Sequence, residues 1–440
     1  MKHGSDAGVG GDIGTISSLA SLLARLQAVA SEPAFNLQRQ RALSIALRPY
    51  TEGAMLPPLA EELRLAEQFL FADYLPDDGQ PSLIEQVRDT ITTHVPEEER
   101  AWLDPFRHSN MDLLEAVSLP GKDRLELRSL GSGRTYHVES GALARRCRPG
   151  QVLLTRVVRA GDRTVIPGTA LVLSASAGRA LFEGVNEWRR ALEAEAGSFE
   201  LGEWEEFVKR YGHVLLWRFA QVRLEALVRA ELATRYRATD GRPFLYALAL
   251  YEHHEYSFLS EGLSNLEGWR KEAGGFQQAS VRSWVQAGDD AASPAARLTL
   301  TPAQLFVECE SGAILDRVKH RLASAFGFAL HFCGEAVTVP PHELQEVNLE
   351  DEDPPPRSVV VTPEAEQELL SAFLESVYME WADRPSPSLG GQTPRHAMGT
   401  ADGRAKVAAL IGALERDDPA ARRTGKSGYE YNRLRAHVGL

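Results

Sequence analysis

Residues 151–173 read QVLLTRVVRAGDRTVIPGTALVL, and this stretch determines which class of fold the chain adopts. Its apolar side chains fall in three short runs, at 151–159, 163–166 and 169–173, which Gly-Asp and Pro-Gly dipeptides separate. Short apolar runs divided by such turn residues are typical of neighbouring β-strands. We therefore predict three consecutive strands here.

The residues just before this stretch extend the β pattern. Leu125 and Leu127 alternate with polar residues, a Gly-Ser-Gly turn follows, and Tyr136 and Val138 resume the alternation. Five short strands in about 50 residues predict a small, strongly twisted β-barrel-like module over residues 121–175. Small barrels often bind nucleic acids or peptides, but a fold alone does not establish function, and we favour a structural or interaction module.

Residues 14–120 are predicted to be helical throughout. Apolar side chains recur there at the spacing of one helix face, beginning with Leu19, Leu22, Leu23, Leu26 and Val29. This period is typical of an amphipathic helix. Four shorter amphipathic stretches follow, so we expect a helical N-terminal module.

Residues 176–339 mix helical and strand patterns. Residues 201–236 have a helical period, and residues 244–251 (FLYALALY) are apolar on both faces, as in a central buried strand. Further strands are predicted at 278–286, 297–300, 304–309 and 328–332, with a helix at 312–325. This order predicts a mixed α+β domain with a partly antiparallel sheet.

Residues 340–357 read PPHELQEVNLEDEDPPPR and form the clearest boundary in the chain. The acidic run 350–353 is unsuited to burial, and the prolines favour an extended geometry, so we expect a solvated linker. A C-terminal helical module, 358–440, follows. The whole chain is thus expected to be a multi-domain α+β protein, with a helical N-terminal module, a small β-barrel-like module, a mixed α+β domain and a C-terminal helical hairpin.

The composition indicates a globular protein. Hydrophobic residues make up 43% of the 440 residues and charged residues 25%, which are ordinary values. A net charge of −13 excludes a chain coated in positive charge for nucleic acid or anionic lipid. Three cysteines cannot form a disulfide framework, and no apolar run reaches the length of a membrane span. We expect a cytoplasmic location and no membrane association.

The sequence motifs predict no catalytic, cofactor-binding or metal-ligating set. Gly425-Lys426-Ser427 ends like a phosphate-binding loop, but Ala420 stands where the first glycine is required. His342-Glu343 begins like a zinc-protease helix, but Glu346 replaces the second histidine. We therefore expect no cofactor and no metal.

Two polar features keep an alternative open. His253-His254-Glu255 follows the predicted buried strand, and strand ends often hold ligand-binding groups. Adjacent residues on an extended chain point to opposite faces, however, so the two histidines could share a metal only if a turn reorients them. Cys147 lies among arginines that favour its thiolate, but no His or Asn at a recognisable spacing accompanies it. We favour capping or surface roles for the first feature and a bystander role for the second.

Residues 381–415 read WADRPSPSLGGQTPRHAMGTADGRAKVAALIGALE. The glycine pair permits a turn, and the Thr-Pro dipeptide that follows suits the first turn of a helix. Thr400 is placed to cap a second helix, which completes a helix–turn–helix-like hairpin whose exposed face could dock a partner. The candidate interaction residues are Trp381, Leu389, Gly390, Gly391, Thr393, Pro394 and Arg395.

This segment resembles the C-terminal domain of Xre/MbcA/ParS-type antitoxins, which in that family binds a partner toxin. A closer resemblance is to uncharacterised bacterial proteins that often carry SEC-C zinc motifs. They share the Leu-Gly-Gly-x-Thr-Pro-Arg segment and a terminal Leu-Arg and Gly-Leu, here Leu434-Arg435 and Gly439-Leu440. The SEC-C cysteines are missing from this chain, and no antitoxin-type DNA-binding domain precedes the motif, so the resemblance implies a protein partner and no zinc site.

Three functions follow as hypotheses. The favoured one is a non-catalytic protein-interaction or regulatory factor. The second is a nucleic-acid-associated or toxin–antitoxin-like regulator, because residues 394–440 carry nine Lys and Arg against five Asp and Glu, a net +4. This basic tail could touch nucleic acid or the acidic linker of its own chain, and self-contact or solvation is favoured. The third is an enzyme of unrecognised type centred on His253-His254-Glu255.

Overall fold

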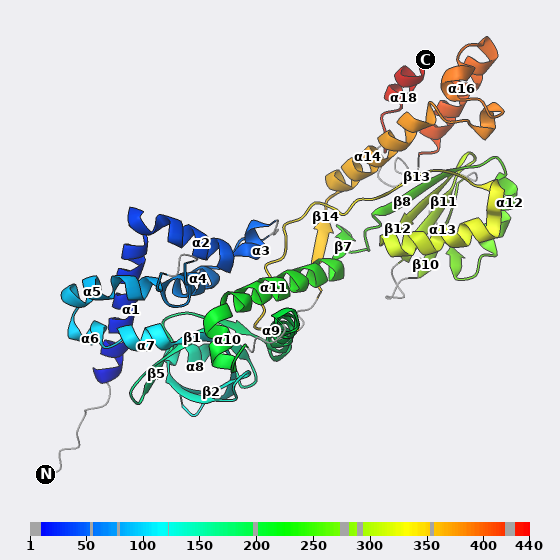
Figure 1. The fold of residues 1–440 in the computed structure, drawn as a ribbon. Helices are drawn as coiled ribbons and strands as arrows, with labels where there is room; N and C mark the ends of the chain where they lie inside the picture. Colours follow the sequence, from blue (N-terminus) through cyan, green and yellow to red (C-terminus); the bar gives the residue numbers. More distant parts are fainter. Residues whose placement is uncertain are drawn as a thin grey trace. The chain divides into compact units, whose positions relative to one another are not determined.

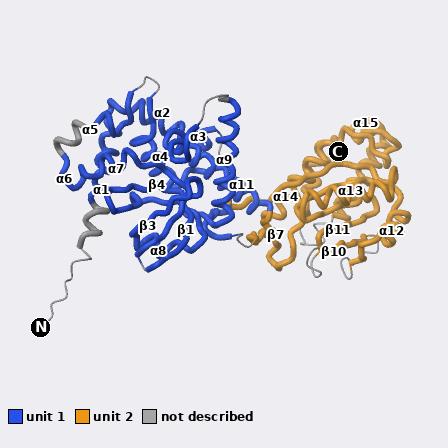
Figure 2. Tube along the Cα trace, turned by 60° about the horizontal axis from the view of Figure 1, so that its bottom comes forward, with its two compact units in different colours: residues 1–232, 345–355 blue, residues 233–344, 356–440 orange. Residues whose placement is uncertain are grey.

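Helices and antiparallel sheets share the chain, as the sequence predicts. The computed structural model describes residues 10–52, 56–76, 80–121, 123–196, 201–272, 281–287, 294–352, 356–418 and 427–440. Helix accounts for 51% and strand for 21%, which confirms the α+β class. The chain forms two compact units (Figure 2): unit 1 comprises residues 1–232 and 345–355, and unit 2 comprises residues 233–344 and 356–440.

Unit 1 begins with helices, as predicted (Figure 1). Leu19, Leu22 and Leu26 are buried in a core that also takes in Leu65 and Phe106. The helices are α1 (Gly10–Ala30), α2 (Asn36–Ala46), α3 (Arg48–Thr51), α4 (Ala60–Ala72), α5 (Leu83–His94), α6 (Glu97–Arg100) and α7 (Leu103–His108), with the 3-10 turn η1 (Pro33–Phe35) between α1 and α2.

The expectation of helix through residue 120 is wrong for strand β1 (Asn110–Ser118). β1 pairs with a strand on each side and is buried on both faces, so its sequence does not alternate between polar and apolar residues. Its sheet has the order β3-β2-β1-β4-β5, with β6 also paired to β4, and curls into a half-barrel. The remaining strands are β2 (Arg124–Ser129), β3 (Thr135–Glu139), β4 (Val152–Ala160), β5 (Arg163–Val165) and β6 (Ala170–Leu173).

Both faces of this sheet are covered. Leu113 and Leu154, which are opposite in register, pack into the large core beneath the helices. Leu114 and Leu153, one position along, pack into a second core that is completed around α8 (Gly141–Arg146). The β module is therefore part of unit 1 together with the N-terminal helices, and the two do not form separate bodies.

Three helices complete unit 1: α9 (Ala175–Ala196), α10 (Trp204–Tyr211) and α11 (His213–Ala233). The predicted helix over 201–236 is divided at Gly212. A Cβ at this position would lie 2.8 Å from the Val208 carbonyl oxygen and 3.0 Å from Met111 Cε, so only glycine allows this close approach.

The predicted linker does not run free in solvent over residues 345–352. The Ser174 amide donates to the Leu349 carbonyl oxygen at 2.6 Å, and Leu349 packs against the core of unit 1. Packing of the half-buried Leu349, the ion pair of Glu350 with Arg146 and the hydrogen bonds of Glu352 with Ser176 overcome the preference of this segment for water. Residues 353–355 lie outside the described part of the chain.

Unit 2 is built on an antiparallel sheet of order β13-β8-β12-β11-β10-β9. In strand β8 (Ala247–Glu252), Ala247 and Ala249 face a core with α12 and α13, while Leu248 and Leu250 face a core with α14 (Pro363–Trp381) on the other side of the sheet. This two-sided burial confirms the predicted buried strand, shifted to 247–252. The elements are β8 (Ala247–Glu252), α12 (Tyr256–Ser264), β9 (Trp269–Lys271), β10 (Arg282–Ala287), β11 (Pro294–Leu300), β12 (Gln304–Cys309), α13 (Gly312–Phe326), η2 (Gly327–Ala329) and β13 (His331–Val337).

A helical C-terminal part packs on the same unit. Its elements are α14 (Pro363–Trp381), η3 (Pro387–Leu389), α15 (Pro394–Ala397), α16 (Ala401–Arg416) and α18 (Tyr431–Val438). A short parallel pair, β7 (Arg235–Ala238) and β14 (Ser358–Val361), precedes it. The predicted domains 176–339 and 358–440 differ from the observed units in two ways. Helices α9 to α11 pack in unit 1, and the antiparallel sheet of unit 2 shares a core with the C-terminal helices.

Candidate functional site

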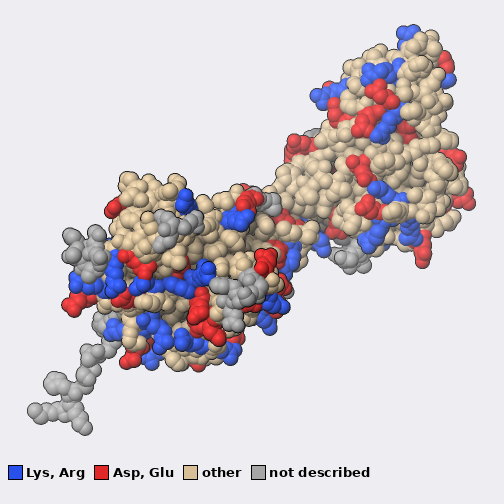
Figure 3. Space-filling view, viewed as in Figure 1, with Lys and Arg blue, Asp and Glu red and all other residues tan. Residues whose placement is uncertain are grey.

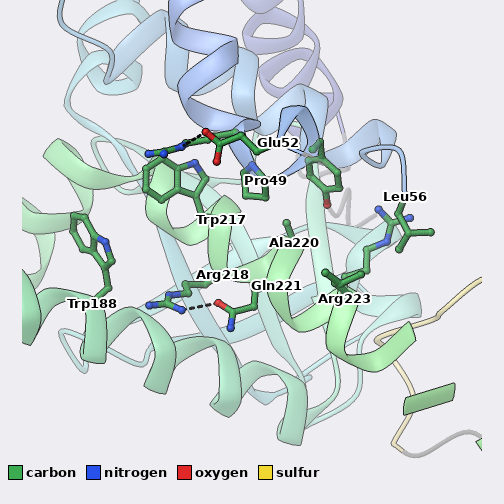
Figure 4. Close-up of a pocket in the computed structure, with 12 residues that line it drawn as sticks. Pro49, Glu52, Leu56, Trp188, Trp217, Arg218, Ala220, Gln221 and Arg223 are labelled. Carbon is green, nitrogen blue, oxygen red and sulfur yellow. Dashed lines mark hydrogen bonds and ion pairs between the residues drawn. The ribbon is translucent and has the colours of Figure 1, made fainter. Parts of the chain in front are cut away.

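The candidate site is a pocket of about 500 Å³ in unit 1 (Figure 4). Helix α11 lines one side, α3 and the residues after it line the other, and Trp188 of α9 lies at one end. The volume is in the range of small-ligand sites, which are concave and mostly apolar with a few placed polar groups.

Aromatic and aliphatic side chains form much of the lining. Trp217 is fixed by a hydrogen bond of 2.6 Å from its Nε1 to the Ile45 carbonyl oxygen. The Arg48 guanidinium lies 5.7 Å from the centroid of the same ring, a cation–π arrangement. Trp188, Pro49 and Leu224 add further apolar surface. These contacts hold an indole face at the pocket without needing a ligand.

The spacing of the α11 residues explains how one helix supplies most of this wall. Trp217, Ala220, Gln221 and Leu224 follow the i, i+3, i+4, i+7 spacing of one helix face. The small side chain of Ala220 leaves room between the larger ones.

The charged residues of the lining differ in how they are paired. Arg48 Nε donates to Glu52 Oε1 at 2.9 Å, and Arg223 pairs with the buried carboxylate of Glu62. Arg218 Nη1 instead donates to the neutral Gln221 Oε1 at 2.6 Å, as the dashed line in Figure 4 marks. Among the lining residues that the structure describes, Arg218 is thus the only cation without a carboxylate partner.

A buried network supports the opposite end of the pocket. Glu62 is fully buried and accepts hydrogen bonds from the Tyr50 hydroxyl and, at 2.7 Å, from the Leu59 amide. Arg223 Nη1 lies 3.3 Å from Glu62 Oε2 and donates to the Pro57 carbonyl oxygen at 2.8 Å. Burial raises the pKa of Glu62, and burial together with the Glu62 charge raises that of Tyr50, so the phenol stays protonated. This network is a rigid support and lacks an activated nucleophile.

The titratable acid and phenol groups of the lining are Glu52 and Tyr50. Of the described residues that line it, none is Cys, Ser, Thr or His, the side chains that most often act as nucleophile or proton shuttle. Nothing in the sequence pointed to this pocket, because its walls lie about 170 residues apart along the chain and carry no motif.

The cluster His253-His254-Glu255 lies in unit 2, where the two histidines have different partners and His254 Nε2 lies 3.9 Å from Glu255 Oε1. His253 is buried, with Nε2 2.9 Å from the Thr301 carbonyl oxygen, and burial lowers its pKa. His254 is exposed and stacks on His331 with ring centroids 6.0 Å apart. Over the described residues, no three His, Cys, Asp or Glu side chains gather in a metal-binding group.

Cys147 is buried, and burial raises its pKa to about 11, against the thiolate that its arginine neighbours favour. Arg146 points instead to Glu350, with Nε 2.9 Å from Oε1. Cys309 and Cys333 are buried in strands, as expected of core residues.

The seven candidate interaction residues come together around one turn in unit 2. Trp381, Leu389 and Pro394 are buried, and Thr393 Oγ1 accepts a hydrogen bond of 3.1 Å from the His396 amide. Gly390 and Gly391 have φ of 65° and 83°, and Arg395 Nε lies 2.7 Å from Asp383 Oδ1. The apolar members of the motif thus build the module itself, and the exposed members are the two glycines and Arg395.

Three arginines of the basic tail, Arg395, Arg433 and Arg435, have acidic neighbours. Arg435 pairs with Glu415, and Arg433 lies 3.7 Å from both Glu375 and Glu430. Lys and Arg are interspersed with Asp and Glu on the face of the molecule in Figure 3. Arg422, Arg423 and Lys426, and with them the Gly425-Lys426 part of the rejected phosphate loop, lie outside the described residues.

Comparison with known protein families, with curated proteins and with solved structures found no match. Across the described residues, no helix is both long enough and apolar enough to cross a membrane. The structure defines a mixed α+β protein whose unit 1 contains a pocket lined by aromatic, aliphatic and arginine side chains.

Proposed function

We propose that the protein is a non-catalytic protein-interaction or regulatory factor, and that its unit 1 pocket binds a flat apolar group bearing a negative charge. The observation that carries this proposal is Arg218, a cation paired only with a neutral amide in a pocket that two indole rings line. A ligand carboxylate would give this guanidinium the bidentate partner it lacks.

The apolar lining supplies affinity and Arg218 supplies selectivity. Covering indole surface with an aromatic group removes apolar area from water, at about 25 cal/mol per Å². A charge-assisted hydrogen bond adds roughly 1.5–3 kcal/mol and discriminates against neutral ligands. An aromatic residue flanked by an acidic residue in a partner protein has this chemistry, as does a free aromatic acid.

Calorimetry with 2-naphthoate and its neutral isostere 2-naphthamide tests the proposal on the full chain. We expect naphthoate to bind roughly tenfold more tightly than naphthamide, and Arg218→Gln to remove that preference. Arg229→Gln, an exposed arginine on the same helix outside the pocket, is the matched control and should change nothing. Equal binding of the two probes, or a preference that survives in Arg218→Gln, would refute the charge selectivity.

A peptide probe separates the two sources of this chemistry. The tripeptide acetyl-Asp-Trp-Asp-amide should displace naphthoate if the pocket takes an aromatic anchor from a partner protein. If naphthoate binds and the tripeptide does not displace it, the pocket is restricted to small aromatic acids and the protein-interaction role is wrong.

Two alternatives stay predictions. A toxin–antitoxin-like or nucleic-acid-associated role rests on the segment 381–415 and the basic tail, and its test is binding that weakens with salt. An enzyme centred on His253-His254-Glu255 draws little support from a buried His253 bound to a main-chain oxygen and an exposed His254 stacked on His331.

A further inference from the structure

Residues 345–352 (QEVNLEDE), called the strap here, are bound along unit 1 without helix or strand and turn at residues 349–352, where the Glu350 amide donates to Asn348 Oδ1 at 3.0 Å. Main-chain atoms at three points are held. The Gln345 amide donates to Glu231 Oε1 at 3.1 Å, the Ser174 amide donates to the Leu349 oxygen at 2.6 Å, and Gln151 Nε2 donates to the Glu350 oxygen at 2.8 Å.

Two acidic side chains of the strap meet complementary groups. The Glu350 carboxylate accepts from Arg146, with Nε at 2.9 Å. Glu352 lies at the beginning of α9, where the Ser176 amide donates to Oε1 at 3.0 Å and the Ser176 hydroxyl to Oε2. Those hydrogen bonds lower the pKa of Glu352, so the carboxylate is charged at neutral pH. Arg146, Gln151, Ser174 and Ser176 are called the seat below.

The strap fills its seat incompletely. A cavity of about 380 Å³ lies beside strap residues 346–350. Its other walls include the apolar side chains Leu59, Leu171, Val172 and Phe219. The strap places only Val347 and the half-buried Leu349 there as apolar groups, so a larger side chain at the position of Val347 would gain contacts that the strap itself does not make.

The ion pair that holds the strap on the seat is weak enough for a competing peptide to displace the strap. The Arg146 and Glu350 side chains keep 45% and 24% of their exposure, and ion pairs exposed to this extent contribute little and are screened by salt. A competing segment with the same charges and a better apolar anchor would therefore displace the strap.

We propose that the seat is a receptor for an acidic peptide of a partner protein that takes the turned conformation of the strap, with a bulky apolar residue at the position of Val347, and that the strap occupies it in cis. Recognition comes from main-chain hydrogen bonds, two acidic side chains two residues apart, and an apolar side chain in the cavity. This site is distinct from the proposed naphthoate pocket, and its test does not depend on that pocket.

The experiment uses the full chain and a labelled peptide of residues 345–352 with the substitution Val347→Phe, followed by fluorescence anisotropy. We expect at least tenfold tighter binding to the chain carrying Glu350→Lys and Glu352→Lys, whose own strap is weakened, than to the unaltered chain. In that background Arg146→Ala should weaken binding about three- to fivefold, whereas Arg145→Ala, at an exposed neighbour on α8, should leave it unchanged. The peptide with the natural Val347 should bind more weakly than the substituted peptide.

Each opposite result has a clear meaning. Failure of the strap-weakened chain to bind, or equal binding with Arg146→Ala and Arg145→Ala, would overturn the seat as a receptor. Equal binding of the two peptides would overturn the role of the cavity.

Hydrogen exchange on the unaltered chain gives a second measurement that requires no variant to fold. Excess peptide should speed exchange of the Gln345 amide of the strap, because the displaced strap loses its hydrogen bond to Glu231. The Ser174 amide should stay protected, because the Leu349 carbonyl oxygen of the peptide replaces that of the strap as its acceptor. Unchanged exchange at Gln345 under saturating peptide would contradict displacement.

Discussion

Arg156 and Asp73 form an ion pair in unit 1 with both side chains fully buried. Arg156 Nη1 also donates to the Ser109 carbonyl oxygen at 2.7 Å, and Lys209 Nζ lies 2.7 Å from Asp73 Oδ1. The guanidinium stacks 5.3 Å from the centroid of the Phe106 ring. Arg156 of β4 thus ties the end of α4 and the end of α7 to the sheet, and Lys209 of α10 binds the same Asp73 carboxylate and Ser109 carbonyl oxygen.

Removing one partner of this pair should destabilise the protein strongly. We expect Asp73→Asn to lower the free energy of unfolding by about 3–5 kcal/mol, because an unpaired buried charge remains. The control is Glu139→Gln, which removes the partner of the exposed Arg124 and should cost at most about 1 kcal/mol. Urea denaturation followed by tryptophan fluorescence measures both, and similar losses for the two variants would contradict the assignment.

Asp112 should make stability depend on pH. Burial raises its pKa to about 6, although Trp204 Nε1 donates to its Oδ1 at 2.7 Å. The folded state therefore binds this proton more tightly than the unfolded state does, and the stabilising effect present at low pH is lost as pH rises through about 6.

The variant Asp112→Asn keeps an oxygen for Trp204 and removes the charge. It should be more stable than the unaltered protein at pH 7.5, by up to about 3 kcal/mol, and the advantage should vanish near pH 4. Thermal unfolding across this pH range measures the difference. Glu187→Gln, at an exposed site on α9, is the control, and its difference in stability from the unaltered protein should not change with pH. If the difference for Asp112→Asn were also independent of pH, the pKa of Asp112 would be the same in the folded and unfolded states.

The predicted interaction motif also yields a stability test. Thr393 Oγ1 accepts from the His396 amide at the beginning of α15, so Thr393→Ala should cost about 1 kcal/mol and Thr393→Ser much less. Arg395→Ala removes an exposed ion pair and should cost at most about 1 kcal/mol. If Thr393→Ala left the unfolding midpoint of unit 2 unchanged, the cap would not contribute to stability.

Local sequence patterns predicted most elements but not how they group. The strands within 151–173, the two-sided burial of 247–252 and the caps at Thr393 and Thr400 depend on residues close together in the chain. Strand β1 was not predicted because both of its faces are buried, so its sequence lacks the alternation of polar and apolar residues that identifies a strand with one exposed face.

The candidate sites could not be predicted in the same way. Trp217 and Arg218 belong to an ordinary amphipathic helix in the sequence, and their role arises only where α3 lies beside them. The acidic segment was predicted to be solvated, because no local pattern encodes Arg146, about 200 residues away, as the partner of Glu350.

By itself the sequence determined that this protein is an α+β chain with two-sided buried strands, a capped C-terminal hairpin and an acidic average charge. Only the tertiary structure decided that the β module and the N-terminal helices share one core, that the acidic run binds unit 1, and that two tryptophans and an arginine surround a pocket. Secondary structure follows from neighbours three or four residues apart, whereas cores, pockets and ion pairs depend on contacts between segments far apart in the chain.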